Sequence, residues 1–131
     1  MKRLSAPVPY EHVEQTHLFQ WAAIPVVRQQ YPELEMMFAI PNGGARTGIA
    51  GALMKAEGVK KGVPDILLPV KRGGHSGLFV EMKRRKHGVV SEDQNWWIAN
   101  LEENGFMAVV VKGFDEARTM IEWYLGLEKT T

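Results

Sequence analysis

The sequence predicts an α/β fold in which a mixed β-sheet is flanked by helices. Three observations support this prediction: helical periodicity near both ends of the chain, a central hairpin pattern, and a continuous apolar run before the last helix. The 131 residues are 45% hydrophobic and 24% charged, which is typical of one globular domain with a real core. The predicted element order is α-β-α-β-β-α-β-α.

The first helix is expected from Glu11 to Gln30. Glu14, Leu18 and Trp21 recur at helical spacing, so they share one face of this helix. Pro25 has no backbone N–H and should therefore kink the second half.

The middle of the chain predicts three strands and one helix. A short apolar run at 36–40 is typical of a strand, and it ends in the turn sequence Pro41-Asn42-Gly43-Gly44. Residues 46–57 are expected to be helical. Residues 64–69 and 77–83 predict the two strands of a hairpin.

The last third of the chain predicts a helix, a strand and a closing helix. Ser91 is a good N-cap for a helix that runs to about Asn104, with Gly105 just past its end. The apolar run at 106–111 predicts a buried strand, and residues 114–125 show helical periodicity.

Composition excludes several classes of protein. The chain has no cysteine, which excludes disulfides, zinc knuckles, iron–sulfur clusters and thiol nucleophiles. The N-terminal segment has no apolar run of the kind found in secretory signals, and no stretch approaches the roughly 18 apolar residues of a membrane span. We therefore expect a soluble, cytoplasmic protein.

Charge is unevenly distributed along the chain. Residues 44–90 contain ten basic and three acidic residues, a local charge of +7, whereas the remainder carries −6. Such segregation favours an anionic partner, most often nucleic acid. The alternative interpretation of the run Lys83-Arg84-Arg85-Lys86 is a solvated face.

The hairpin brings two carboxylates together. Gly73 is the midpoint between positions 65 and 81, so Asp65 should lie opposite Glu81, with Cβ atoms about 5 Å apart. Two carboxylates at this distance repel each other unless a cation lies between them, and a hard divalent ion would satisfy both. Lys83 shares their face because side chains alternate along a strand. The alternative is a surface ion pair between Glu81 and Lys83.

Two further polar residues occupy otherwise apolar helix faces. Gln94 shares a face with Trp97, Ile98 and Leu101, and Glu14 heads the apolar face of the first helix. Either side chain could reach the hairpin site, or could lie at a frayed helix end in solvent.

These residues form part of an ordered set of motifs. The set consists of Glu14, Asn42-Gly43-Gly44, Gly62-Val63-Pro64-Asp65, Phe79-Val80-Glu81-Met82-Lys83, Ser91-x-x-Gln94-x-x-Trp97, and Gly105 before an apolar strand. It resembles the VRR-Nuc (virus-type replication–repair nuclease) family of the PD-(D/E)xK nucleases over about residues 11–125. The P-D and E-x-K motifs are weak separately, but the ordered set is specific.

The resemblance implies a restriction-endonuclease-like fold and a metal-dependent nuclease. Asp65 and Glu81 would bind Mg²⁺ or Mn²⁺, with help from the backbone carbonyl of Met82. Glu14 would bind or orient a second ion or its water. Lys83 would position and activate the attacking water, and Gln94 would orient Lys83 or the scissile phosphate.

The residues that would contact nucleic acid are Asn42, Gly43, Arg46, Lys60, Lys61, Arg84, Arg85 and Lys86. The expected domains are an extended arm over residues 1–10, a nuclease domain over 11–126 and a tail over 127–131. The resemblance is compatible with a viral or bacterial source.

The expected function is hydrolysis of branched DNA, with Holliday-junction resolution by a homodimer as the leading candidate. The alternatives are a nuclease for flaps, nicks or ends, and a catalytically silent DNA-binding module on the same fold. An RNA-directed module is disfavoured because the aromatic RNA-recognition motif is absent. The adjacent residues Trp123, Tyr124 and Leu125 are a candidate dimer contact, with core packing as the alternative.

Overall fold

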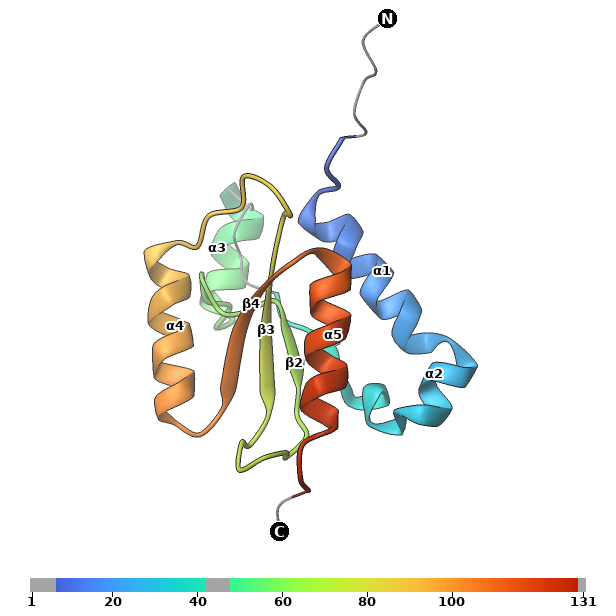
Figure 1. Cartoon of the computed structure of the whole chain (residues 1–131). Helices are drawn as coiled ribbons and strands as arrows, with labels where there is room; N and C mark the ends of the chain where they lie inside the picture. Colours follow the sequence, from blue (N-terminus) through green and yellow to red (C-terminus); the bar gives the residue numbers. More distant parts are fainter. Residues whose placement is uncertain (1–6, 42–47, 130–131) are drawn as a thin grey trace, which may run out of the picture.

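The computed structural model describes residues 7–41 and 48–129. It contains one four-stranded sheet in the order β1-β2-β3-β4, packed between helices (Figure 1). The first three strands pair antiparallel and the last pair is parallel, so the predicted mixed sheet is confirmed. The strands are β1 (Phe38–Ala39), β2 (Ile66–Leu68), β3 (Leu78–Lys83) and β4 (Met107–Lys112).

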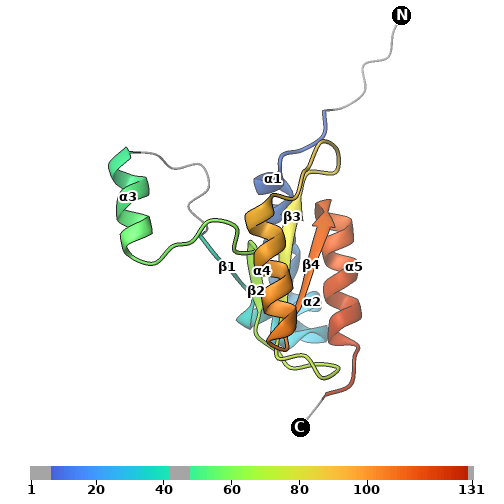
Figure 2. The same cartoon turned by 90° about the vertical axis from the view of Figure 1, so that its left-hand side faces the viewer.

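Helices α1 and α5 cover one face of the sheet and α4 covers the other (Figures 1 and 2). Their order along the chain agrees with the prediction, apart from the division of the first helix and a short 3-10 turn after it. The helical segments are α1 (Glu11–Ala23), α2 (Pro25–Gln30), the 3-10 helix η1 (Pro32–Met36), α3 (Gly48–Ala56), α4 (Glu92–Glu103) and α5 (Gly113–Leu125).

The first helix breaks rather than kinks at Pro25. Ile24 adopts an extended backbone, with φ −62° and ψ 128°, and separates α1 from α2. The ring of a proline disfavours the helical conformation in the residue before it, and proline itself suits the first position of a new helix. One predicted helix therefore becomes two.

Helix α3 stands away from the sheet (Figure 2). None of its residues is buried, and the side chain of Ile49 is 81% exposed. The helix occupies most of the predicted range 46–57. The predicted DNA contacts Asn42, Gly43 and Arg46 lie outside the described residues.

The hairpin has the predicted register. Ile66 pairs with Val80 and Leu68 pairs with Leu78, and this register continues to Asp65 opposite Glu81. Its tip is closed by an antiparallel bridge between residues 72 and 75, which is one residue out of that register because residues 69–71 on one strand stand against residues 76–77 on the other. Gly73 and Gly74, with φ 56° and 84°, supply the two left-handed positions that such a short hairpin turn requires.

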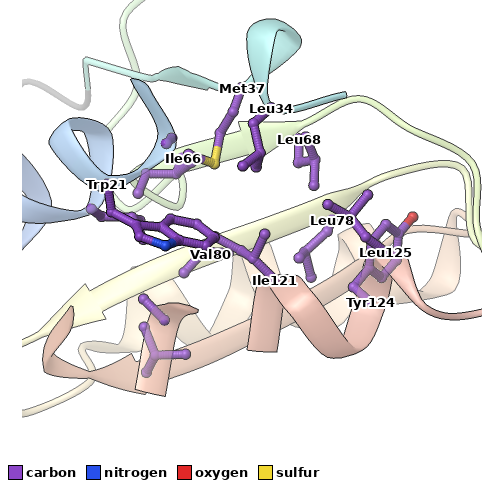
Figure 3. Packing of buried hydrophobic residues seen from close by; sticks show 14 of the residues in the cluster. Trp21, Leu34, Met37, Ile66, Leu68, Leu78, Val80, Ile121, Tyr124 and Leu125 are labelled. Atoms are coloured by element: carbon purple, nitrogen blue, oxygen red, sulfur yellow. The ribbon is translucent and has the colours of Figure 1, made fainter. Parts of the chain in front are cut away.

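Strand β3 divides its side chains between two environments. Leu78, Val80 and Met82 are fully buried in the main core with residues of α1 and α5, such as Trp21 and Ile121 (Figure 3). The alternate side chains point to the α4 face, where Phe79 packs edge-to-face on Phe106 at a centroid distance of 5.3 Å. Glu81 and Lys83 share this second face.

The structure also bears on the candidate dimer contact at residues 123–125 and on the expectation that no segment spans a membrane. Tyr124 and Leu125 belong to the core, whereas Trp123 is 52% exposed on α5. Across residues 7–41 and 48–129, no helix combines the length and apolar character needed to cross a bilayer.

Candidate active site

Asp65 and Glu81 face each other from adjacent strands, as the hairpin arithmetic predicts. Asp65 directly precedes β2, and its Oδ2 accepts a hydrogen bond from the backbone N–H of Met82 at 2.8 Å. Its own carbonyl accepts the N–H of Ile40 at 2.7 Å, which ties this position to the end of β1. Glu81 lies inside β3 and is 2% exposed. Both carboxyl groups are therefore held in place by sheet pairing.

Burial raises the pKa values of both carboxyl groups of this pair. Burial raises the pKa of Asp65, against the opposing hydrogen bond from Met82. Burial and then the charge of Asp65 raise the pKa of Glu81 to about 8, although the Lys83 ammonium lowers it in part. In the absence of a cation, burial and the charge of Asp65 therefore favour the protonated form of Glu81. A divalent cation would stabilise the ionised form and displace that proton.

The two oxygens of Glu81 have different surroundings. Oε1 accepts a hydrogen bond from Nε2 of Gln94 at 2.9 Å and lies 3.6 Å from Nζ of Lys83. Oε2 is buried and receives no hydrogen bond from any described residue. A buried carboxylate oxygen without a donor is a costly arrangement for packing alone. Oε2 is thus the oxygen available to a ligand beside Asp65.

Gln94 is oriented by the start of α4. Its Oε1 accepts the N–H of Ser91 at 2.9 Å, while the Ser91 hydroxyl accepts the N–H of Gln94 at 3.2 Å. This reciprocal capping box leaves the amide nitrogen to point at Glu81. Gln94 therefore reaches the hairpin site, as one of the two sequence interpretations expected, but its contact is with Glu81 rather than with Lys83.

Gly62 allows the loop before Asp65 to approach the first turn of α4. It has φ +91°, and a Cβ atom there would lie 2.7 Å from Cβ of Asp93. Lys61 pairs with Asp93 across the same contact at 3.7 Å. The Gly-Val-Pro-Asp motif thus brings β2 and the capping box of α4 to one site.

Glu14 lies in a different contact from the one expected. It is buried, and its Oε2 accepts the backbone N–H of Phe114 at 2.6 Å. Its Oε1 lies 3.8 Å from Nε of Arg85. A Cβ atom at Gly113 would collide with Oε2 of Glu14 and lie 2.6 Å from Cγ of Arg85. The structure thus brings Glu14 to the start of α5.

Glu11 also contributes to the electrostatics of the pair, although the sequence interpretation did not single it out. It lies one helical turn before Glu14, and its negative charge raises the pKa of both Asp65 and Glu81. Helical periodicity selected Glu14 because that position interrupts an apolar face. An acidic residue at the first position of a helix is common for another reason, the helix dipole, so Glu11 gave no distinct signal.

The basic residues that were predicted to contact DNA fall into two groups, those that are exposed and those that bind other parts of the chain. Lys60 and Lys86 are exposed, and Lys61 is exposed beside Asp93. Arg84 and Arg85 are engaged within the chain. Arg84 donates to the carbonyl of Val8. Arg85 lies beside Glu14, with 53% of its side chain exposed.

The donor set at the hairpin fits a hard divalent cation. Asp65 and Glu81 offer carboxylate oxygens, the ligands that Mg²⁺ and Mn²⁺ prefer. The raised pKa values and the buried Oε2 of Glu81 are features that such an ion would relieve. No cluster of three or more histidine or acidic side chains with metal-binding geometry occurs within the described parts of the chain. Further ligands would therefore come from the backbone, from water or from a bound phosphate.

Comparison with known proteins identifies the family of the chain. The VRR-NUC domain matches the chain over residues 7–115. A solved structure named "VRR_NUC domain protein" superposes with a TM-score of 0.77 at 28% identity, and covers 94% of this chain and 93% of that one. No curated protein sequence matches the chain. The chain belongs to the VRR-NUC family of nuclease domains and has the restriction-endonuclease-like fold.

Proposed function

We propose that the protein is a Mg²⁺- or Mn²⁺-dependent endonuclease that hydrolyses phosphodiester bonds in branched DNA. The observation that carries the proposal is the half-buried Asp65 opposite the buried Glu81, with Lys83 on the same strand face as Glu81. Two facing carboxylates with raised pKa values and an adjacent ammonium are expensive to bury without a charged ligand.

Each side chain has a separate task in this proposal. Asp65 and Glu81 hold the cation. The ion, when bound, would lower the pKa of a water and offset charge on the phosphate. Lys83, 7% exposed, positions the attacking water and stabilises the developing negative charge on the phosphate. Gln94 keeps Oε1 of Glu81 occupied, so that Oε2 faces the ion.

Holliday-junction resolution by a homodimer is the specific activity that we propose. One chain supplies one site, and resolving a four-way junction requires two nicks. A twofold dimer matches the approximate twofold symmetry of the junction. Of the three apolar residues expected near the end of α5, Trp123 is the one exposed to a second copy. Activity on flaps, nicks or ends is the alternative within the same chemistry.

A cleavage panel tests the function. Four-way, flap, nicked and linear DNAs of identical sequence are incubated with the protein in Mg²⁺, Mn²⁺ or EDTA. We expect metal-dependent cutting of the junction at two symmetry-related strands and none with EDTA. The variant Asp65→Asn, purified identically, controls for a contaminating nuclease.

The same samples distinguish the rival functions. Junction binding without cleavage in either metal would favour a silent DNA-binding module. Equal cutting of linear DNA would remove the resolvase assignment and leave the nuclease. Sedimentation with and without a four-way junction measures the oligomeric state, and a monomer in both cases contradicts the dimer.

A further inference from the structure

Glu14 and Arg85 form an ion pair that links α1 to the turn after β3. Oε1 of Glu14 lies 3.8 Å from Nε of Arg85, and the two side chains are 8% and 53% exposed. The other carboxylate oxygen, Oε2, accepts the backbone N–H of Phe114 at 2.6 Å. Helix α1 packs beside α5 (Figure 1), and its buried acid thus contacts both an arginine of the basic run and the start of α5.

The stem of Arg85 is confined from a second side. A Cβ atom at Gly113 would lie 2.6 Å from Cγ of Arg85 and 2.9 Å from Cδ, so a side chain at position 113 would displace the stem. Gly113 is buried and has φ +84°, a left-handed conformation that favours glycine. The aliphatic part of Arg85 therefore lies against the backbone where β4 passes into α5.

The turn that carries Arg85 is itself closely packed. A Cβ atom at Gly88 would lie 2.9 Å from the carbonyl oxygen of Arg84 and 3.0 Å from Cβ of Lys83, so the chain returns onto the end of β3. Arg84 is held separately, because its Nε and Nη2 donate to the carbonyl of Val8 at 3.3 and 2.8 Å. These contacts fix the backbone from which Arg85 projects.

The guanidinium of Arg85 keeps donors for a ligand. Glu14 contacts it through Nε, and within residues 7–41 and 48–129 its two terminal nitrogens donate no hydrogen bond. Two N–H groups of one guanidinium match two oxygens of a phosphate. Arg85 follows Lys83 by two residues, which spans at most about 7 Å of chain. It would therefore meet a phosphate close to the carboxylate pair.

We propose that Glu14 is a positioning residue that holds Arg85 ready to bind a backbone phosphate of the DNA, beside the phosphate that is cleaved. A long side chain loses rotamer freedom on binding, and one that is already held loses less. The charge of Glu14 opposes this gain because it repels the phosphate, but screening by salt weakens that repulsion. The ordering of Arg85 therefore decides the sign of the effect on DNA affinity. This inference rests on the proposed function.

Glu14→Gln tests the inference because it removes the charge and keeps an acceptor. The amide oxygen can still accept the N–H of Phe114, whereas the ion pair with Arg85 is lost. Binding of a four-way junction is measured in Ca²⁺ at about 0.15 M salt. We expect the affinity to fall about fivefold, the effect of having to order one long side chain on binding. An unchanged or higher affinity would overturn the inference, because loss of a negative charge by itself favours DNA binding.

Glu116→Gln is the matched control. It removes the same charge from the exposed surface of the first turn of α5, and among the described residues Glu116 forms no ion pair. Its DNA affinity should equal or slightly exceed that of the parent. A fivefold fall in this variant as well would show that any acid at this end of α5 supports binding, and would overturn the assignment to Glu14.

Arg85→Lys distinguishes a held fork from a surface charge. Lysine keeps the charge but does not bind two phosphate oxygens in the plane of one fork. We expect DNA affinity to fall about fivefold with an unchanged log–log salt slope, because the number of neutralised phosphates stays the same. Parental affinity in Arg85→Lys would show that Arg85 acts only as a charge, which contradicts the inference.

A double-mutant cycle connects the two residues. In an Arg85→Lys background, Glu14→Gln should weaken DNA binding no further, because the fork that it holds is already absent. Additive losses would show that Glu14 acts elsewhere and would overturn the inference. Thermal unfolding verifies that each variant is folded, and Arg85→Lys, which leaves the buried Glu14 in place, keeps the inference falsifiable if Glu14→Gln does not fold.

Calorimetry with Mn²⁺ and the DNA-free protein distinguishes this role from a metal-binding one. Glu14→Gln should bind Mn²⁺ as the parent does, because both oxygens of Glu14 already contact other groups of the chain. Weaker Mn²⁺ binding would assign Glu14 to an ion and overturn the inference. A parent protein that neither binds nor cuts DNA would overturn the proposed function itself. A parent that does both, with normal DNA affinity in Glu14→Gln, would overturn only the role of Glu14.

Discussion

The amide nitrogen of Gln94 lies 2.9 Å from Oε1 of Glu81, and this contact joins the start of α4 to the centre of the sheet. The same side chain closes the capping box with Ser91. A residue that caps a helix therefore also decides which oxygen of a buried carboxylate accepts a hydrogen bond. The two tasks use different atoms of the amide, so they can be separated by substitution.

Gln94→Glu should impair the site while leaving the helix intact. Glutamate still accepts the N–H of Ser91, because it is the usual partner in a capping box. It has no donor for Glu81 and adds a negative charge beside it. We expect stability to change by less than about 1 kcal/mol and Mg²⁺-dependent turnover to fall at least about tenfold.

Ser91→Ala is the matched control for that variant. It should lower the free energy of unfolding by about 1 kcal/mol, the usual value of an N-cap, and affect turnover less than Gln94→Glu does. Chemical denaturation and single-turnover cleavage measure the two effects. Normal turnover in Gln94→Glu would show that the Glu81 contact is dispensable.

Stability in EDTA should fall as the pH rises from about 5 to 8. The pKa of Glu81 is raised from its ordinary 4.5 to about 8, so the folded state binds a proton that the unfolded state has released in this window. The unfolded state then binds fewer protons, and stability decreases with pH. The raised pKa of Asp65 acts in the same direction.

Melting temperatures at several pH values in EDTA measure this dependence. Glu81→Gln should flatten it, because glutamine does not titrate. Saturating Mn²⁺ should stabilise the parent protein most at high pH, where the carboxyl groups are ionised and bind the metal without losing a proton. A melting temperature that rises from pH 5 to 8 in EDTA would contradict the raised pKa values.

Local signals in the sequence predicted that Asp65 and Glu81 face each other across a hairpin. The spacing between Asp65 and Glu81 brackets Gly73, and the observed register keeps the apolar residues Ile66, Leu68, Leu78 and Val80 in the core. Ser91 and Gln94 have the spacing of a capping box, so the start of α4 was also predictable. Each of these features depends on residues close together in the chain.

Contacts between distant segments were not predictable in the same way. Glu14 binds the N–H of Phe114, a hundred residues further on, and periodicity along α1 contains no information about that contact. Arg84 likewise binds the carbonyl of Val8, although its neighbours in the sequence indicate only a basic run. The contacts of Glu14 therefore could not be derived from its position on α1, because tertiary packing decides them.

Gly113→Ala should lower the free energy of unfolding by more than the backbone strain at that position would by itself. Gly113 has φ +84°, and an added Cβ would displace Glu14 and the stem of Arg85. Gly74 has the same φ of +84° with open space around it, so Gly74→Ala measures the strain by itself. We expect about 1 kcal/mol for Gly74→Ala and at least about twice that for Gly113→Ala. Equal losses in chemical denaturation would show that Glu14 moves aside freely.

Lys83→Met should lower turnover strongly and DNA affinity weakly. The ammonium is almost fully buried, 3.6 Å from Oε1 of Glu81, whereas Lys86 is exposed. Methionine keeps the length and apolar stem of lysine but removes the charge that the proposed transition state requires. We expect the rate of single-turnover cleavage at saturating DNA to fall by about a hundredfold or more, with DNA binding in Ca²⁺ unchanged within a few fold.

Lys86→Ala is the control for this variant, because it should weaken DNA binding and leave the cleavage rate at saturating DNA unchanged. If both variants weaken binding to the same extent and neither changes the saturated rate, Lys83 is only another member of the basic surface.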